Sequence, residues 1–507
     1  MRPSLPLLVW PAATAFFLVH LLVACGSETF DGPGGPDATT SSGDGATESG
    51  LAPGDDGSAT DTSDGGMPND ATADARHDGG TTNDAGALQL SNRLVAGYQA
   101  TCALSSTGAA KCWGFNGQAV LGLGDTTNRG DDPNEMGTRL PTVALGTGRT
   151  ASQVVLGKAH ACALLDDGSV KCWGYNDVNA GQLGLGRADI LGDQAGEMGD
   201  ALPVVNVGIG RTAVQLAAGY MHTCALLDNG TVKCWGENDF GQLGLGDTSA
   251  RGDGPGEMGD ALPSVSLGTG RTAKQVTAGA QFSCALLDDE TVKCWGNNNH
   301  GKLGIGDTQN RGTSPNQMGD SLQRANVGAG RTVKQLTSGA HHVCARLDDG
   351  TLKCWGNNQN GELGLGDTQK RGDGPGEMGD ALPTVRLGAG RTVVDVRAGF
   401  SHTCARLDDG ALKCWGYNFG GPLGLGDTSD RGTLTAHMGD ALPAVALGTG
   451  RKATGFACGI DHTCALLDDG TLKCWGSNNS GQLGLGDKAG RGASANQMGD
   501  ALPTVSF

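Results

Sequence analysis

The stretch Cys224–Gly246, CALLDNGTVKCWGENDFGQLGLG, decides the fold of this chain. It consists of two short apolar runs on either side of Asp228-Asn229-Gly230, which is the sequence pattern of a β-hairpin. Glycine at the third loop position predicts a three-residue loop with a left-handed last residue. That loop pairs Cys224 with Cys234 directly across the hairpin. Their Cβ atoms should lie about 4.5–5.5 Å apart, a separation that a disulfide closes with slight adjustment.

Similar stretches occur seven times, and in each the two cysteines are separated by nine residues. The first cysteines of successive stretches lie 60 or 62 residues apart. A fixed period of this length is the signature of a repeat architecture, so we expect seven hairpins, each closed by its own disulfide. The expected pairs are Cys102 with Cys112, Cys162 with Cys172, Cys224 with Cys234, Cys284 with Cys294, Cys344 with Cys354, Cys404 with Cys414, and Cys464 with Cys474.

Each repeat contains four short apolar segments that read as strands. In the third repeat they are residues 215–218, 223–227, 231–235 and 262–267. Seven four-stranded units predict an all-β, seven-bladed β-propeller. The first repeat starts at Asn92 without a preceding fourth segment, and the last ends on one, so we expect the N- and C-terminal strands to close the ring. Glu290 replaces the turn glycine in one repeat and predicts a strained or different loop there.

The sequence divides into three regions: residues 1–24, 25–87 and 88–507. The first has one charge, Arg2, and an apolar run from Leu7 to Ala24, which is typical of a secretory signal peptide. It ends in Leu22-Val23-Ala24-Cys25, which resembles a bacterial lipobox and predicts a lipidated Cys25 at the mature N-terminus. The alternative is an ordinary signal peptide followed by an incidental cysteine.

Residues 26–87 are rich in small and acidic residues, with 13 acidic side chains and one basic one, Arg76. Such a segment buries too little apolar surface to fold, so we expect a disordered tether between a membrane and the propeller. It accounts for −12 of the net charge of −18, since 13 acids and one base give −12. The repeat region is therefore only mildly acidic. It has no basic stripe of the kind that binds nucleic acid, so we expect no nucleic-acid partner.

The motif WGxNxxGQLGLGD, seen at residues 475–487, resembles the repeat of the regulator-of-chromosome-condensation family across residues 88–507. The resemblance implies a seven-bladed propeller. The founding member is a nucleotide-exchange factor on chromatin, a role that the export signal argues against here. Some exported bacterial relatives inhibit β-lactamases, which implies that the scaffold presents a protein-binding face. Fold alone does not assign the function.

The aromatic side chains of the repeat region concentrate in the loops at one end of the predicted blades, and we expect this end to bind a partner. Large aromatic side chains at variable loop positions are typical of binding hot spots. The alternative is that they line the mouth of the ring structurally. The residues are Tyr98, Phe115, Tyr175, Tyr220, Phe240, Phe282, Phe400, Tyr417 and Phe419.

Other repeated side chains are expected to be structural. Histidines such as His222 precede the first cysteine in five repeats, and we expect hydrogen bonds there rather than a metal site, because equivalent positions in seven blades lie too far apart for one ion. Loop acids such as Asp253, Glu257 and Asp260 leave calcium as a lesser alternative to solvated carboxylates. Cys458 is expected to be a buried, inert thiol.

No set of nucleophile, base and orienting residue is present in the sequence, so we expect no enzyme, no cofactor and no metal. The expected function is an envelope-anchored binding module that presents its loops to a protein or other macromolecule. The alternatives are an inhibitor of an extracellular or periplasmic enzyme and, less favoured, an enzyme acting in the propeller mouth. The expected location is the bacterial cell envelope, at the outer membrane or cell surface, through the lipid on Cys25.

Overall fold

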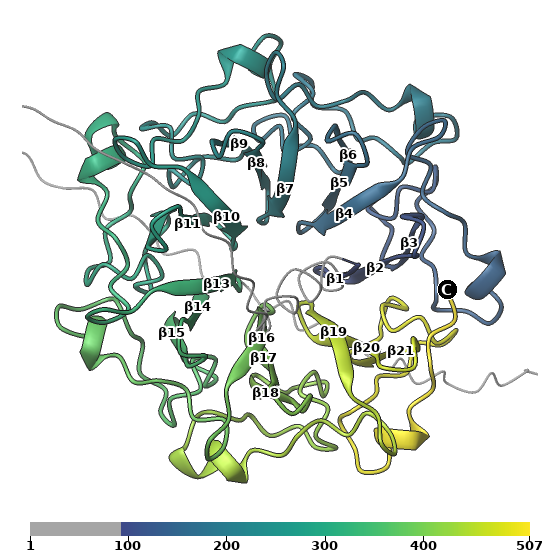
Figure 1. Cartoon of the computed structure of the whole chain (residues 1–507). Helices are drawn as coiled ribbons and strands as arrows, with labels where there is room; N and C mark the ends of the chain where they lie inside the picture. Colours follow the sequence, from purple (N-terminus) through teal and green to yellow (C-terminus); the bar gives the residue numbers. More distant parts are fainter. Residues whose placement is uncertain (1–92) are drawn as a thin grey trace, which may run out of the picture. The chain divides into compact units, whose positions relative to one another are not determined.

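The computed structural model describes residues 93–507, so the predicted signal peptide, Cys25 and acidic tether lie outside the described residues. The described chain forms seven antiparallel sheets of three strands each around a common axis (Figure 1). Each sheet is built from three consecutive strands, from β1-β2-β3 to β19-β20-β21. We call the sheets blades 1 to 7 in chain order. The predicted all-β, seven-bladed propeller is thereby confirmed.

The strands of each blade run from an inner strand near the axis to an outer strand (Figure 1). The inner strands are β1 (Leu94–Ala96), β4 (Ala151–Leu156), β7 (Ala213–Ala218), β10 (Ala273–Ala278), β13 (Val333–Ser338), β16 (Val393–Ala398) and β19 (Ala453–Cys458). The middle strands are β2 (Ala100–Leu104), β5 (His160–Leu165), β8 (His222–Leu227), β11 (Phe282–Leu287), β14 (His342–Leu347), β17 (His402–Leu407) and β20 (His462–Leu467). The outer strands are β3 (Ala110–Gly114), β6 (Val170–Gly174), β9 (Val232–Gly236), β12 (Val292–Gly296), β15 (Leu352–Gly356), β18 (Leu412–Gly416) and β21 (Leu472–Gly476).

Short 3-10 helices lie in the long loops that follow the outer strands. They are η1 (Gly137–Arg139), η2 (Gly199–Ala201), η3 (Gly259–Ala261), η4 (Pro315–Gln317), η5 (Gly319–Ser321), η6 (Gly379–Ala381), η7 (Thr435–His437), η8 (Gly439–Ala441) and η9 (Gly499–Ala501). Within residues 93–507, no helix has the length and apolar character needed to cross a membrane.

The predicted fourth strand of each blade is wrong: the structure has an extended segment that meets the outer strand at a single residue, which in blades 4 and 7 forms an isolated bridge. In blade 3 the amide of Val265 donates to the carbonyl of Val232 at 2.8 Å, and every blade repeats this bond. In an antiparallel ladder the next donor would be two residues away. Pro263 occupies that position and has no amide hydrogen, so the pairing stops after one bond.

The ring is not closed by exchange of terminal strands, which corrects the second expectation. The terminal segment pairs within its own repeat, since the amide of Val505 donates to the carbonyl of Leu472 at 2.7 Å. Every blade is therefore complete within one repeat. Blades 7 and 1 meet through other contacts, among them the amide of Ile460 with the carbonyl of Gly97 at 3.1 Å and the amide of Gly137 with the carbonyl of Ser506 at 2.9 Å.

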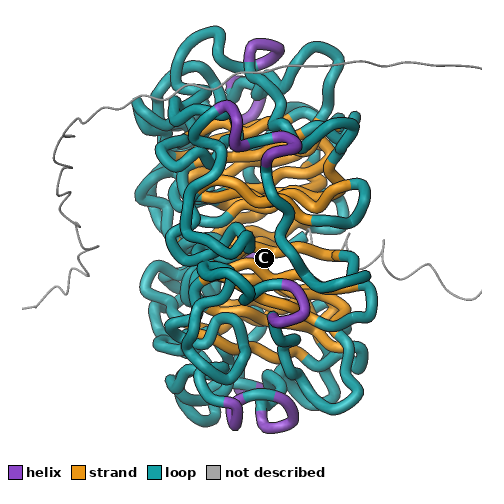
Figure 2. The backbone as a smooth tube through the Cα atoms, turned by 90° about the vertical axis from the view of Figure 1, so that its left-hand side faces the viewer, coloured by secondary structure: helices purple, strands orange, loops and turns teal. Residues whose placement is uncertain are grey.

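The strands run between two loop-covered ends of the ring (Figure 2). We call one end the loop face, which carries the turns between inner and middle strands and the long loops after the outer strands. The opposite end is the hairpin face, which carries the tight turns between middle and outer strands and the connections to the next inner strand. The two faces differ in how uniform they are from blade to blade.

The core of the ring lies between neighbouring blades. One buried cluster, for example, joins Cys224, Leu226 and Val232 of blade 3 to Val276, Leu287 and Trp295 of blade 4. Alternation along β8 places Cys224 and Leu226 toward blade 4 and Ala225 and Leu227 toward blade 2. Packing between blades therefore holds the loops of the loop face in fixed relative positions.

Candidate functional site

Seven disulfides staple the hairpins that support both faces, and each joins the predicted pair of cysteines. In blade 3 the amide of Leu227 donates to the carbonyl of Thr231, and the amide of Gly230 donates to the carbonyl of Leu227, both at 2.9 Å. Because bonded and non-bonded pairs alternate, Cys224 and Cys234 form a non-bonded pair, in which side chains lie closest. Their Cα atoms are 4.1 Å apart.

Glu290 adopts the same loop conformation as the glycines it replaces, with φ at 63°. Its amide donates to the carbonyl of Leu287 at 2.9 Å, as the glycine amide does in other blades. The loop of blade 4 is therefore not different in form. It carries a non-glycine residue in the left-handed region. Of the two predicted outcomes, a strained loop or a different loop, the structure shows the strained one.

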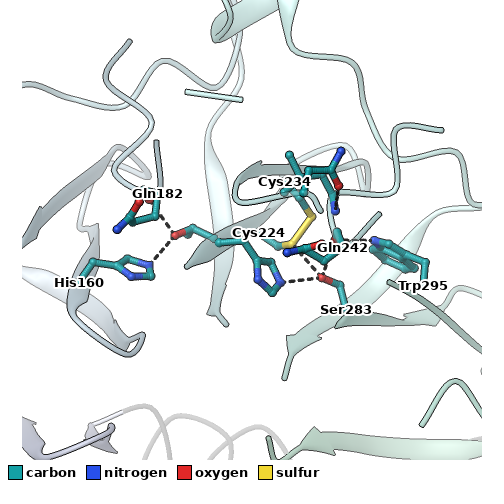
Figure 3. The surroundings of a disulfide bond; sticks show 11 residues. His160, Gln182, Cys224, Cys234, Gln242, Ser283 and Trp295 are labelled. Atoms are coloured by element: carbon teal, nitrogen blue, oxygen red, sulfur yellow. Dashed lines mark hydrogen bonds between the residues drawn. A yellow bond between two sulfur atoms is a disulfide. The ribbon is translucent and has the colours of Figure 1, made fainter. Parts of the chain in front are cut away.

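Buried hydrogen bonds join neighbouring blades, and Figure 3 shows those between blades 3 and 4. The imidazole Nε2 of His222 lies 3.0 Å from the hydroxyl of Ser283. That hydroxyl donates to the carbonyl of Gln242 at 2.9 Å, and the indole of Trp295 donates to the same carbonyl at 3.0 Å. Two groups of blade 4 thus converge on one carbonyl of blade 3.

The histidine–hydroxyl pair recurs at five of the seven boundaries, at 2.8–3.0 Å. The pairs are His160 with Thr223, His222 with Ser283, His342 with Thr403, His402 with Thr463, and His462 with Thr101. At the other two boundaries both positions are apolar and buried: Ala100 faces the position of Ala161, and Phe282 that of Val343. The histidine and its partner are therefore lost together.

These histidines are structural, as the sequence indicated, and they are neutral. Each hydroxyl donates its hydrogen to a carbonyl, as Thr223 does to Gln182. The imidazole therefore donates from Nε2, and its Nδ1 is unprotonated. Burial lowers the pKa of His222 to about 3 and that of His160 to about 4. A Cβ at the preceding turn residue Gly219 would stand 2.1 Å from the His222 ring, which explains the glycine three residues before each of these histidines.

The tryptophans are also part of these boundaries. The seven tryptophans of residues 93–507 are fully buried, and each indole donates to a loop carbonyl of the preceding blade at 2.9–3.1 Å. The acceptor is the second residue of the GQLG motif, for example Gln182 for Trp235. The recurrence of the tryptophan and of the GQLG motif is thus explained by packing between blades and not by a ligand stacked on the indole.

Three of the nine predicted binding aromatics pack against one another at the axis. Tyr220 stacks on Phe400 with ring centroids 5.9 Å apart, and Tyr98 meets Tyr220 edge-on at 6.4 Å. The Lys158 ammonium lies 6.0 Å from the centroids of both tyrosine rings. The axial cavity between the seven inner turns is lined by these residues, so they form the mouth of the ring.

The prediction that Phe282 belongs to the binding face is wrong. It is fully buried in β11, where it occupies the position that histidine holds at five other boundaries. Phe282 follows a predicted turn in the sequence, which suggested a loop residue, but β11 begins at Phe282. The remaining predicted aromatics, Phe115, Tyr175, Phe240 and Tyr417, are partly exposed on the loop face, and Phe419 is 71% exposed.

The loop acids serve the backbone of their own and neighbouring loops. Glu257 accepts the amides of Gly252 and Gly254 at 2.9 Å, and Asp260 accepts the amide of Ile209 at 3.1 Å. Burial is the main cause that raises the pKa of Asp253, whose neighbour Glu257 acts in the same direction. These contacts account for the acidic motif without calcium.

One group of potential metal ligands occurs among the described residues: His402, Cys404 and Cys458. It does not fit a metal, because Cys404 is bonded to Cys414 and has no free thiolate. Burial raises the pKa of the Cys458 thiol to about 12. Cys458 is unpaired and only partly buried, and the raised pKa keeps its thiol protonated at neutral pH.

The hairpin face is nearly uniform. In six boundaries an arginine from the connection to the next inner strand pairs with an aspartate of the following hairpin, as Arg271 does with Asp289 at 2.8 Å. The other arginine–aspartate contacts are Arg149 with Asp167, Arg211 with Asp228, Arg331 with Asp349, Arg391 with Asp409, and Arg451 with Asp469. The charged groups of this face are largely paired with one another.

Comparison with known proteins identifies the family. The RCC1-like domain model matches residues 66–448, and the model of the regulator of chromosome condensation (RCC1) repeat matches residues 454–482. The chain belongs to the RCC1-like domain family. The sequence resemblance to this family is thus confirmed.

Among relatives, the chain is similar to the ultraviolet-B receptor UVR8 of Arabidopsis thaliana, with 32% identity over 65% of this chain and 66% of the receptor. It is 29% identical to part of the human E3 ubiquitin-protein ligase HERC2, over 50% of this chain but 5% of the ligase. The chain thus spans just under two thirds of the first relative and a small part of the second.

Solved structures share the fold. Yeast RCC1 (Prp20), in the structure with Kap60, has a TM-score of 0.57 at 19% identity, over 85% of this chain and 91% of that one. Prp20p of Saccharomyces cerevisiae in a second structure has a TM-score of 0.53 at 21% identity, over 72% and 80%. Human WBSCR16 has a TM-score of 0.52 at 22% identity, over 73% and 84%.

The hydroxyl partners of the histidines and the buried Lys302 were not among the residues predicted from the sequence. Both left a signal. Threonine or serine one residue before the first cysteine disappears in the repeats that follow a repeat without histidine. Lys302 stands where other repeats have glutamine, glutamate, proline or valine. Comparison between neighbouring repeats, instead of within one repeat, would have found them.

Proposed function

We propose that the chain is a binding protein whose loop face recognises a partner protein. The observation that carries the proposal is the contrast between the two faces. At the hairpin face the same ion pair recurs from blade to blade, so its charges satisfy one another. At the loop face equivalent positions differ, with Tyr175, Glu237 and Tyr417 at one of them. A surface that varies on a constant scaffold is the usual arrangement of a recognition site.

Phe419 supports the choice of this face. Its ring is 71% exposed and lies 6.4 Å from the ring of Tyr417, measured between centroids. Aromatic residues are enriched in protein interfaces, and a ring with this exposure is available to a partner. Related folds support a protein partner: the structural descriptions of Prp20 name Gsp1p, histones and Kap60 as proteins that it binds.

The proposal includes anchoring in the cell envelope. The sequence ending in Leu22-Val23-Ala24-Cys25 and the acidic segment 26–87 favour a lipid on Cys25 and a tether that holds the ring away from the membrane, with the outer membrane or cell surface as the location. Replacement of Cys25 by alanine should move the protein from the membrane fraction to the soluble fraction and remove the lipid mass from the N-terminal peptide. An unchanged fractionation and peptide mass would reject the anchor.

The binding face is tested by capture from envelope extract with the full chain as bait. Phe419→Ala and Tyr417→Ala should weaken capture of the partner by about tenfold or more, the range for a hot-spot aromatic. Ile209→Ala is the matched control, because Ile209 is an apolar side chain, 87% exposed, on the hairpin face. Loss of capture with Ile209→Ala and not with the aromatic variants would place the working face at the other end.

A further inference from the structure

Three basic side chains gather on the loop face at the boundary of blades 4 and 5. The imidazole rings of His300 and His341 lie 5.7 Å apart in an edge-on arrangement. Lys302, two residues from His300, is 1% exposed, and its ammonium lies 5.5 Å from the centroid of the Phe282 ring. The Nδ1 atoms of both imidazoles are buried and have no hydrogen-bond partner within residues 93–507.

Lys302 is not explained by the packing of its own loop. At the equivalent position Gln242 accepts the amide of Phe240 at 2.9 Å, and Glu362 accepts the amide of Asn360 at 2.9 Å. Lysine has no acceptor atom and cannot make this bond to the amide of His300. Blade 4 thus gives up a loop hydrogen bond and buries an ammonium in its place. The contact with the Phe282 ring replaces the lost bond only in part, and a departure of this kind from the local rule is typical of a functional position.

The charges around the cluster are mainly positive. Lys302 and Lys370 both lower the pKa of His300, and Asp373 is the carboxylate that opposes them. Burial is the largest cause that lowers the pKa of His300 to about 4 and that of His341 to about 3, and Lys302 adds to both shifts. Burial alone lowers the pKa of Lys302 to about 7, with no carboxylate to compensate. In a chain with net charge −18, it is Lys302 that has no opposing carboxylate in this cluster.

The cluster lies next to the aromatic side chains that form the mouth of the ring. His341 meets Phe400 edge-on with centroids 5.7 Å apart, and Phe400 stacks on Tyr220. The inner turns of blades 4 and 5 carry alanines, Ala280 and Ala340, where other blades carry tyrosine, lysine, phenylalanine or isoleucine. Both imidazoles are partly exposed, whereas Lys302 is more deeply buried. Because the Nδ1 atoms are buried, each imidazole can donate to a ligand at the surface from Nε2, while the ammonium supplies charge at short range.

We propose that His300, His341 and Lys302 form a binding site for an oxyanion, a carboxylate or phosphate group carried by the protein partner. The proposal rests on the loop face being the binding face. An oxyanion would accept hydrogen bonds from the imidazoles and would supply the negative charge that Lys302 lacks. The adjoining rings of Phe400 and Tyr220 would contact the apolar part of the residue that carries the anion.

The site is tested without the partner, by adding inorganic phosphate or a blocked triglutamate peptide to the full chain and following the histidine Cε1–H resonances by NMR. The resonances of His300 and His341, assigned with His300→Gln and His341→Gln, should move at millimolar concentrations, and the tighter of the two anions identifies the group. Lys302→Gln should weaken binding by at least about tenfold, because it removes a charge within a few ångströms.

Lys302→Gln is suited to this test because glutamine stands at the same position in three other blades, so the variant should fold. Lys452→Gln, an exposed lysine that leads into an inner strand on the hairpin face, is the matched control and should leave the titration unchanged. Unmoved His300 and His341 resonances with both anions, or equal binding by Lys302→Gln, would overturn the site. Either result is independent of the capture experiment, which tests the face through Phe419.

Discussion

The imidazole of His222 in blade 3 lies 3.0 Å from the hydroxyl of Ser283 in blade 4, and neither group is exposed to solvent. This pair links the two blades only when the imidazole carries its hydrogen on Nε2. The hydroxyl donates its own hydrogen to the carbonyl of Gln242, so the imidazole has to be the donor between them. Four further boundaries have the same pair. Stability of the ring therefore depends on imidazoles that stay neutral.

We expect the protein to lose stability as the pH falls below about 6.5. The folded chain holds the pKa of His222, His342 and His462 at about 3 and that of His160 and His402 at about 4 because they are buried. Between these values and the ordinary pKa, the unfolded chain binds more protons, so acid favours unfolding. Each histidine contributes up to about 1.4 kcal/mol per pH unit. Urea unfolding at pH 7.5 and 5.5 measures the slope, and equal free energies of unfolding would contradict the prediction.

The pairing of His222 with Ser283 is tested by a double-mutant cycle. Ser283→Val leaves the Nε2 hydrogen of His222 without an acceptor and should cost about 1–3 kcal/mol. Adding His222→Phe recreates the apolar pair that Phe282 and Val343 form elsewhere in the ring, so part of the loss should return. Denaturant unfolding of the four proteins gives the coupling. Purely additive effects would show that the two side chains act independently.

Each disulfide should stabilise its own blade by a modest amount. The double variant Cys224→Ala with Cys234→Ala opens a short loop, and we expect it to lose about 2–3 kcal/mol without changing the fold. Peptide mapping under non-reducing conditions should find the seven links within repeats. Links between repeats, or free thiols at these positions, would be incompatible with the register of the hairpins. Cys458 should be the one cysteine of residues 93–507 that is found unbonded.

Removal of residues 499–507 should destabilise the ring far more than removal of nine residues from the segment 26–87. The deletion takes away Leu502 and Val505, which are nearly fully buried, and the carbonyl of Gly499 that accepts the Lys473 ammonium at 2.7 Å. It also removes Phe507 from the ring of Trp113 in blade 1. Loss of the two buried side chains alone should cost about 3–6 kcal/mol. Calorimetry compares the variants, and equal melting temperatures would refute the role of this segment.

Local features were predictable from the sequence, and contacts between repeats were not. The register of Cys224 and Cys234 follows from the three-residue loop, because loop length fixes which residues face each other. Pro263 shows where local reading failed: the segment around it is apolar enough for a strand, but proline cannot donate the bond that would extend the pairing. The inward position of Phe282 depends on its partner Val343 in another blade, which hydrophobic pattern within one repeat does not reveal.

The boundary between blades 1 and 2 gives the ring an uneven response to protons. Ala100 with Ala161 replaces the histidine–hydroxyl pair there, and neither side chain titrates. Five other boundaries depend on a neutral histidine of that pair, and the boundary of blades 4 and 5 contains His300 and His341, whose pKa values burial lowers to about 4 and about 3. Acid therefore weakens six boundaries and spares one. Hydrogen exchange in mild acid should reveal blades 1 and 2 as a cooperative unit that outlasts the remaining blades, although all seven repeats are nearly alike in sequence.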